Sequence, residues 1–245
     1  MDISEQAVDY IKKITKSKEL FLKYADDKKY APFPVPLTLF MAGSPGAGKT
    51  ETSKYLILNL KNFLSQKSEI DYSVVRIDAD EIREKCPGYD GQNAHLFQAA
   101  ASLGVNKLYD YVIKRKFNVL VDGTFSNSRY AQANIEIALN KKREVYIYYI
   151  FQEPERAWEF TLKRERLQNR KITMDTFISS FIGAKDNVNE VKRLYKDKIK
   201  INLIKKDYEN NIEKVWLNID NIDNFIKFDY TKQAIFGRIK DIKLK

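Results

Sequence analysis

Cysteine, histidine, glycine and proline are scarce in this chain of 245 residues. It holds one cysteine, Cys86, one histidine, His95, 9 glycines and 6 prolines, while 44% of its residues are hydrophobic. A lone cysteine cannot close an internal disulfide, which favours a reducing compartment. A lone histidine argues against a histidine-based metal site or a Ser-His-Asp triad. The composition excludes a disordered or fibrous chain, and we expect a globular protein.

Long apolar runs and a strong charge bias are also missing. No run approaches the roughly 18 to 20 apolar residues of a membrane helix, and the first residues include Asp2 and Glu5 rather than a signal-peptide core. We therefore expect a cytoplasmic protein with no membrane partner. The 43 basic and 33 acidic residues leave a net charge of +10, which could attract nucleic acid. Because both signs are interspersed, a solvated basic surface explains the excess better, and we do not expect a nucleic-acid partner.

Short β-rich runs alternate with stretches of helical pattern. Strands are predicted at residues 37–42, 73–77, 118–121, 145–150, 199–204 and 214–218. Helices are predicted at residues 3–24, 50–64, 94–114, 129–141, 153–168 and 173–195. This alternation is typical of βαβ units and a parallel sheet. Three prolines within residues 31–36 end the first helix, so we divide the chain into a helical N-terminal extension, residues 1–35, and one α/β domain, residues 36–245.

A phosphate-binding motif follows the first predicted strand. The run GSPGAGKT, residues 43–50, matches G-x-x-x-x-G-K-[ST] at every fixed position, between a strand and a helix. Its glycines let backbone N–H groups approach phosphate oxygens, Lys49 would bind the β- and γ-phosphates, and the Thr50 hydroxyl would bind Mg²⁺. We predict a P-loop fold of three α/β/α layers around a mostly parallel sheet. Its ATP or GTP site would comprise Gly43, Ser44, Pro45, Gly46, Ala47, Gly48, Lys49, Thr50 and Glu51.

Carboxylates follow the second and third predicted strands. Asp78 and Asp80 straddle the end of the second strand, where parallel sheets bind ligands. Asp80 is the candidate base that would accept the proton of an acceptor hydroxyl, although capping of the next helix is an alternative role for these acids. Asp122 ends the third strand and is a candidate Mg²⁺ ligand near the substrate, although Asp-Gly is also ordinary turn chemistry.

Arginines gather in the predicted helix that begins at Pro154. Arg166 and Arg170 would repel each other at their spacing of four residues, which favours an anionic ligand over a purely solvated helix face. We predict a small helical lid in which Arg164 and Arg170 neutralise charge on the transferred phosphoryl group. Arg156 and Arg166 are further candidates.

The ordered set of motifs resembles the zeta toxin family of P-loop kinases, over about residues 36–203. It comprises A-G-S-P-G-A-G-K-T-E, I-D-A-D-E-I-R, V-D-G-T and W-x-x-T-x-x-R-E-x-x-x-x-R. The resemblance implies a kinase that phosphorylates a nucleotide sugar, typically the 3′-hydroxyl of UDP-N-acetylglucosamine. It implies Lys49 and Thr50 at the nucleotide and Arg164 and Arg170 on the triphosphate. It also implies Asp80 as the base, with Asp122 and Thr124 near the substrate. We add Asp78 and Arg83, at the end of the second strand, as substrate-binding candidates.

Two departures from the best-studied toxins point to the chromosomal zeta-like branch. Asp122 stands where those toxins carry Glu, and the lid arginines are more closely spaced. The resemblance also implies an antitoxin protein that blocks the nucleotide site. Helical residues 1–30 could instead cover that site in cis.

Two other functions remain open from the sequence. A kinase acting on the 5′-hydroxyl end of a nucleic acid would use the same P-loop chemistry and would suit the positive charge. A nucleotide-binding interaction module without transfer would need Asp80 only as a helix cap.

Overall fold

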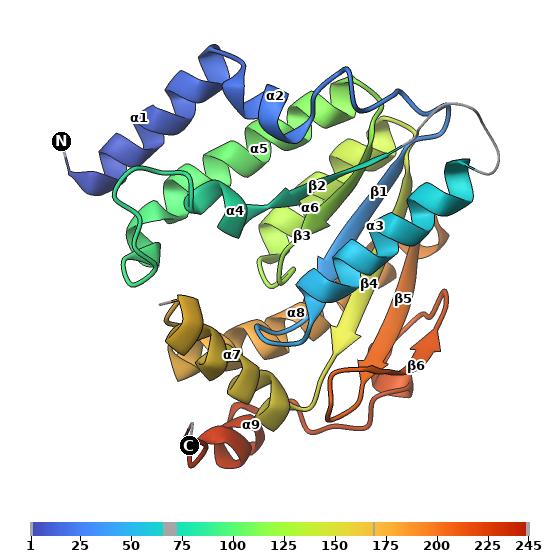
Figure 1. The fold of residues 1–245 in the computed structure, drawn as a ribbon. Coiled ribbons are helices and arrows are strands. Elements are labelled where there is room, and N and C mark those ends of the chain that lie inside the picture. Colours follow the sequence, from blue (N-terminus) through green and yellow to red (C-terminus); the bar gives the residue numbers. More distant parts are fainter. Residues whose placement is uncertain (1, 66–72, 169, 244–245) are drawn as a thin grey trace.

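A six-stranded sheet forms the centre of the protein in the computed structural model, which describes residues 2–65, 73–168 and 170–243 (Figure 1). Its strand order is β2-β3-β1-β4-β5-β6, with β6 alone antiparallel to its neighbour. The mostly parallel sheet was predicted and is confirmed. The strands are β1 (Leu37–Ala42), β2 (Val74–Asp78), β3 (Asn118–Asp122), β4 (Glu144–Phe151), β5 (Ile199–Lys206) and β6 (Ile212–Trp216).

Helices cover both faces of the sheet. They are α1 (Ile3–Lys16), α2 (Glu19–Tyr24), α3 (Lys49–Ser65), α4 (Ala79–Arg83), α5 (Gln98–Lys114), α6 (Ser128–Asn140), α7 (Pro154–Gln168), α8 (Met174–Tyr195) and α9 (Lys232–Ile239). In Figure 1, α3 lies on one face of the sheet and α5, α6 and α8 on the other. This arrangement is the predicted three-layer order. None of the helices in the described part of the chain is both long and apolar enough to cross a membrane.

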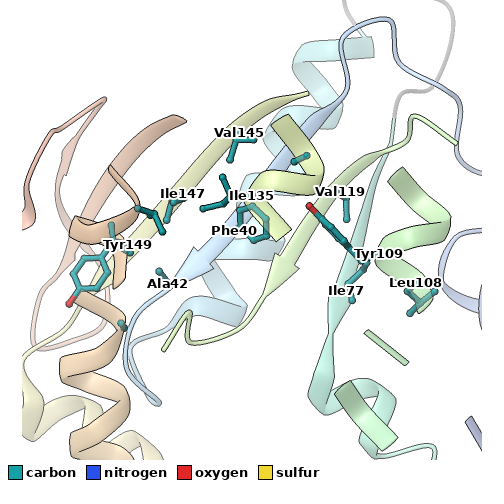
Figure 2. Close-up of a cluster of buried hydrophobic side chains, with 14 of the residues drawn as sticks. Phe40, Ala42, Ile77, Leu108, Tyr109, Val119, Ile135, Val145, Ile147 and Tyr149 are labelled. Atoms are coloured by element: carbon teal, nitrogen blue, oxygen red, sulfur yellow. The ribbon is translucent and has the colours of Figure 1, made fainter. Parts of the chain in front are cut away.

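The main core lies between the sheet and the larger helical layer. Alternate strand residues such as Phe40, Val119 and Ile147 pack there with Tyr109 of α5 and Ile135 of α6 (Figure 2). The intervening residues, which include Leu39, Met41 and Leu120, face α3. β1 and β3 are therefore buried on both faces, which explains their unbroken apolar sequence.

The predicted helix over residues 3–24 is two helices. Asp2 and Glu5 form a capping box at the start of α1. The chain then turns at Ser17 and Lys18, where Lys18 has φ +66°. Left-handed backbone ends a helix, and here neither glycine nor proline marks it in the sequence. The predicted helix over residues 94–114 likewise begins as a separate 3₁₀ turn, Ala94–Phe97, before α5.

The order of the strands places the site. β1 lies centrally between β3 and β4, so the loop after Ala42 emerges in the middle of the sheet. β2 and β3 pair in parallel with Asp78 beside Asp122, which brings the predicted carboxylates to the same edge as that loop. Ligands of open α/β sheets bind at this edge.

Candidate active site

The P-loop runs from the end of β1 into α3 and is enclosed by two other elements. Gly46 and Gly48 have φ of +73° and +83°, which glycine adopts without strain. A Cβ at Gly46 would collide with the carbonyl of Ala157 and the hydroxyl of Thr161 on α7. A Cβ at Gly48 would lie 2.6 Å from Oδ1 of Asn210 in the β5–β6 turn. These glycines therefore let α7 and the turn approach the phosphate cradle closely.

The Lys49 ammonium is held by the loop itself. Its Nζ donates to the carbonyl oxygens of Ser44, at 2.6 Å, and Gly43, at 3.1 Å. Burial lowers the pKa of Lys49 to about 8, although the nearby Asp122 carboxylate opposes the shift. An anion in the loop would favour the charged form of Lys49 and compete for its hydrogen bonds.

A cleft of about 460 Å³ brings most of the predicted site residues together. Its walls include Pro45, Gly46, Gly48, Lys49, Thr50, Glu51, Asp78, Asp80, Arg83, Asp122, Thr124, Arg164 and Arg170. Gly43, Ser44 and Ala47 do not line it and lie buried in the P-loop. The prediction missed several wall residues, among them Phe160, Lys163, Lys171 and Asn210.

The N-terminal helices lie away from the cleft. α1 and α2 pack against α5, with Ile11 and Leu20 in the main core, and Figure 1 shows them together beyond the β2 edge of the sheet. None of the described residues up to residue 30 lines the cleft. The idea that this segment covers the nucleotide site in cis therefore finds no support. The division of the chain into an extension and a domain at residue 35 stays a prediction.

Asp80 projects into the cleft from α4 and is paired with two arginines. Its carboxylate binds Nη1 of Arg83 at 2.6 Å on one oxygen and Nη2 of Arg170 on the other. Burial by itself would raise the pKa of Asp80, but Arg170, Arg83 and Arg164 hold it below its ordinary value. The group is thus ionised at neutral pH and, at 36% side-chain exposure, accessible to a ligand.

Asp78 caps a helix, which is the alternative role considered above for the acids at this strand end. Its Oδ1 accepts the backbone N–H of Asp80 at 2.8 Å and caps α4. Its Oδ2 accepts from Nη2 of Arg76 at 2.6 Å. Burial, followed by the charges of Asp80 and Asp122, raises the pKa of Asp78 to about 6.

Arg76 is a site residue that the sequence reasoning did not identify. It points from β2 between carboxylates of different elements: Asp78, Asp122 and Glu81. Burial would lower its pKa, but these carboxylates, led by Asp122, raise it above the ordinary value. The sequence does contain a signal for this role, because Arg76 is a charged residue between the apolar Val75 and Ile77 of a buried strand. Its positive charge lets the acids at the strand ends stay close together.

Asp122 is only partly available to a metal ion. Its Oδ2 accepts from Nη2 of Arg76 at 2.6 Å and from the Ser53 hydroxyl at 2.8 Å, which leaves Oδ1 as the oxygen for a cation. Among the described residues, no group of three or more His, Cys, Asp or Glu side chains could hold a metal by itself. Mg²⁺ commonly uses one carboxylate, phosphate oxygens and water, so Asp122 and Thr50 fit such a site.

The loop after β3 supports the P-loop. The backbone N–H of Gly43 donates to the carbonyl of Thr124 at 3.1 Å. The Thr124 hydroxyl lies 2.7 Å from that of Ser126. Thr124 therefore lines the cleft and links the loop after β3 to the P-loop.

The lid arginines divide into two groups. Arg164 places Nη2 3.5 Å from the Thr50 hydroxyl, and Arg170, beyond the end of α7, reaches Asp80. Arg156 instead pairs with Glu159 and donates to the carbonyl of Tyr208. Neither Arg156 nor Arg166 lines the cleft, so the cleft contains the two arginines that were assigned to the phosphates.

A family model described as zeta toxin matches residues 22–218. The chain belongs to the zeta toxin family. Among solved structures, one from the PezAT chromosomal toxin–antitoxin system of Streptococcus pneumoniae has a TM-score of 0.64 and 20% identity, covering 88% of this chain and 83% of that one. A comparison with curated proteins gave no match.

Complexes of AvrRxo1-ORF1 with AvrRxo1-ORF2 have the same fold. The structure with sulphate ions has a TM-score of 0.60 and 12% identity, covering 99% of this chain and 73% of that one. The structure with ATP has a TM-score of 0.58 and 12% identity, covering 87% of this chain and 65% of that one. At these identities the likeness shows the fold alone. The recognised family and the P-loop fold class are confirmed, and membership of the zeta toxin family makes this chain a P-loop kinase.

Proposed function

We propose that this zeta toxin family chain transfers the γ-phosphate of ATP or GTP to a hydroxyl group of a small molecule. The observation that carries the proposal is that Lys49 and Thr50 of the P-loop share one cleft with the ionised Asp80. A kinase needs a phosphate cradle and a carboxylate that orients the acceptor hydroxyl, both within reach of the transferred group.

The nucleotide side would use the P-loop and the lid. Backbone N–H groups of the loop and Lys49 would hold the phosphates, and Thr50 with Asp122 would hold Mg²⁺, which bridges and neutralises phosphate oxygens. Arg164, already next to Thr50, would stabilise the charge on the phosphoryl group in flight. The roles of Lys49 and Arg164 follow from their positive charges beside a loop that binds phosphate.

The acceptor side would use Asp80. An ionised carboxylate can accept a hydrogen bond from the acceptor hydroxyl and then its proton as the new P–O bond forms. Its two arginine partners lower its basicity, so orientation of the hydroxyl would be its larger contribution. Arg170 would have to exchange Asp80 for a phosphate oxygen when the nucleotide is bound, which an arginine at the boundary between base and phosphates can do.

A second cavity adjoins the cleft and supports a sugar-containing acceptor. It measures about 500 Å³ and shares Asp122, Gly123 and Thr124 with the cleft. Its other walls are uncharged and combine apolar side chains, such as Val105, with amide and hydroxyl groups. The polar groups belong to Gln98, Ser102, Ser126, Asn127, Tyr130 and Asn134. Such groups suit the hydroxyls of a sugar or nucleoside. Arg83 and Lys171, which line the first cleft, suit a diphosphate. We therefore propose a nucleotide sugar such as UDP-N-acetylglucosamine.

A protein antitoxin is the proposed macromolecular partner. The similar PezAT structure comes from a toxin–antitoxin system. In this chain the described N-terminal helices leave the cleft uncovered, so a separate protein would be needed to block it.

Transfer can be tested with labelled ATP offered together with UDP-N-acetylglucosamine, a 5′-hydroxyl oligonucleotide, or a metabolite extract analysed by mass spectrometry. We expect label on the nucleotide sugar. Asp80→Asn should lower kcat by roughly 10²- to 10⁴-fold and leave nucleotide binding in place. The matched control Asp110→Asn changes an exposed carboxylate on α5 and should leave kcat unchanged.

Three results would redirect the assignment. Label on the oligonucleotide alone would identify a polynucleotide kinase. Nucleotide binding with no labelled product would leave a binding module without transfer. Transfer that survives Asp80→Asn unchanged would show that Asp80 serves only the structure, as a partner of Arg83 and Arg170.

A further inference from the structure

Ser53 connects the helix of the P-loop to the carboxylate that ends β3. It lies on α3 one turn after Thr50 and is 0% exposed. Its hydroxyl oxygen is 2.9 Å from the carbonyl oxygen of Thr50 and 2.8 Å from Oδ2 of Asp122. The hydroxyl has a single proton, and a carboxylate is the stronger acceptor, so we assign that proton to the bond with Asp122.

Arg76 binds the same oxygen of Asp122 from β2. Its Nη2 donates to Oδ2 at 2.6 Å, and its Nε lies 3.2 Å from both Oδ2 and the Ser53 oxygen. The guanidinium group is itself fixed, because Nη2 also donates to Asp78 at 2.6 Å and Nη1 donates to Glu81. Oδ2 of Asp122 is therefore bound by donors from two elements, both of which are held in place.

These bonds determine where the other oxygen of Asp122 is available. In the described part of the chain no donor binds Oδ1, yet this atom is not fully buried. Only 4% of the Asp122 side chain is exposed, and the residue lines both the cleft and the adjoining cavity. A carboxylate otherwise rotates easily about its last side-chain bond. Two fixed donors on Oδ2 therefore keep Oδ1 in one orientation, as the oxygen that a ligand in the cleft can reach.

A fixed orientation of Oδ1 is important for a magnesium ion in particular. Mg²⁺ requires nearly ideal octahedral geometry with short bonds to oxygen, and the partners of a ligating carboxylate strongly affect metal affinity. Without its partners, Asp122 could turn toward the Lys49 ammonium. The two groups are close, since after burial the charge of Asp122 has the largest effect on the pKa of Lys49. Such a pairing would withdraw the carboxylate from a cation.

We infer that Ser53 and Arg76 are positioning residues for the divalent cation, because they hold Asp122 with Oδ1 directed to the ion beside Thr50. This inference rests on the proposed function, in which Thr50 and Asp122 bind Mg²⁺. Both positioning residues lie just outside the motifs that assigned the site. Ser53 is two residues after the first motif, and Arg76 directly precedes the second. Ser53 also joins the two elements that carry the proposed ligands, α3 and β3.

Mn²⁺ is the probe that tests this inference. Water proton relaxation distinguishes Mn²⁺ in a complex with protein and nucleotide from Mn²⁺ on the nucleotide alone. The full chain is saturated with AMP-PNP, an ATP analogue whose terminal phosphate is not transferred. Ser53→Ala should weaken Mn²⁺ binding by roughly tenfold or more, the usual effect of removing a partner of a metal ligand. Arg76→Lys keeps the charge but loses the forked donor group, so it should also weaken Mn²⁺ binding.

Thr15→Val is the matched control for the lost hydroxyl. The Thr15 hydroxyl likewise donates to a helix carbonyl, that of Ile11, at 2.7 Å, but it lies on α1, away from the cleft. We expect the Mn²⁺ affinity of this variant to equal that of the wild type.

A double variant shows whether the effect of Ser53 passes through Asp122. Asp122→Asn should itself bind Mn²⁺ more weakly, and adding Ser53→Ala should then cause no further loss, because residues that act through one group are not additive. A general disturbance of α3 would instead lower the affinity by the same factor in both backgrounds. That result would overturn the inference.

Two further results would also overturn it. One is a Ser53→Ala variant with the Mn²⁺ affinity of the wild type. The other is a change confined to the KM of the acceptor, because Asp122 would then be held for the acceptor. Mn²⁺ binding and transfer are measured separately. If the variants lose Mn²⁺ as expected while the wild type labels no acceptor, the proposed transfer alone is refuted. If the wild type labels its acceptor while Mn²⁺ affinity does not depend on Ser53, the positioning role alone is refuted.

Discussion

At the scale of single residues, two neighbouring acids of the site have different pKa values because their partners differ. Asp80, between two arginines, has a lowered pKa, whereas burial raises the pKa of Asp78 to about 6. Asp80 is therefore ionised at neutral pH, and Asp78 is the carboxylate whose pKa lies closer to neutrality. Neighbouring acids whose pKa values are moved apart are typical of catalytic sites.

Lys49 makes nucleotide binding depend on pH. Its pKa of about 8 in the empty loop follows from burial, and phosphates beside the ammonium would raise it, so binding takes up a proton above that pH. We expect ATP affinity to be level at pH 7 to 8 and to fall by roughly tenfold per unit as the pH rises further. Titration calorimetry in buffers of different ionisation enthalpy would measure the proton uptake.

The comparison variant for this experiment is Lys49→Met. It should bind ATP weakly at pH 7 and show no change of affinity between pH 7 and 10. An affinity of the wild type that stays constant over the same range would mean that Lys49 does not meet the phosphates as a titrating group.

At the scale of elements, the sequence was informative where a feature depends on local order. The P-loop between β1 and α3, and Asp78 and Asp122 at neighbouring strand ends, follow from strand patterns and the parallel sheet. Contacts between distant segments were not predictable. Arg76 meets Asp122 across 46 residues and Arg164 meets Thr50 across 114, and no local pattern encodes such pairings. The break of the first helix at Lys18 was missed for the opposite reason, since its residues are ordinary helix formers.

The close approach of α7 to the P-loop predicts a specific effect of Gly46→Ala. The new Cβ would meet Ala157 and Thr161 at a residue whose φ is +73°. The loop must then move or α7 must withdraw, either of which disrupts the phosphate cradle. We expect ATP affinity to fall at least tenfold, which corresponds to about 1.4 kcal/mol, measured by displacement of a fluorescent nucleotide.

Gly237→Ala is the matched control for this change. Gly237 lies within α9, and a Cβ there has no neighbour within 4 Å. Alanine should keep ATP affinity and raise the unfolding free energy by about 0.5–1 kcal/mol, because glycine weakens a helix interior. Equal ATP affinity of the two variants would show that α7 does not constrain the loop at Gly46.

At the scale of the whole molecule, α1 and α2 share the core of the sheet rather than standing apart from it. Ile11 is 0% exposed and Leu20 is 2% exposed, in the same cluster as Phe40 and Val119. The zeta toxin match begins at residue 22, yet α1 packs along α5. Burial of this kind couples the stability of the first helix to that of the sheet.

Ile11→Ala tests this coupling through the two tryptophans, both of which lie outside the N-terminal helices. Trp158 packs against Phe177, and Trp216 against Phe225, so denaturant unfolding followed by tryptophan fluorescence reports on the rest of the protein. We expect the variant to lower the unfolding free energy in that signal by about 2–5 kcal/mol, as is usual for truncating a buried isoleucine. Leu22→Ala, at a side chain that is 63% exposed, should change it by less than about 0.5 kcal/mol. A tryptophan transition of Ile11→Ala that coincides with that of the wild type would show that the helices unfold independently and form a separate extension.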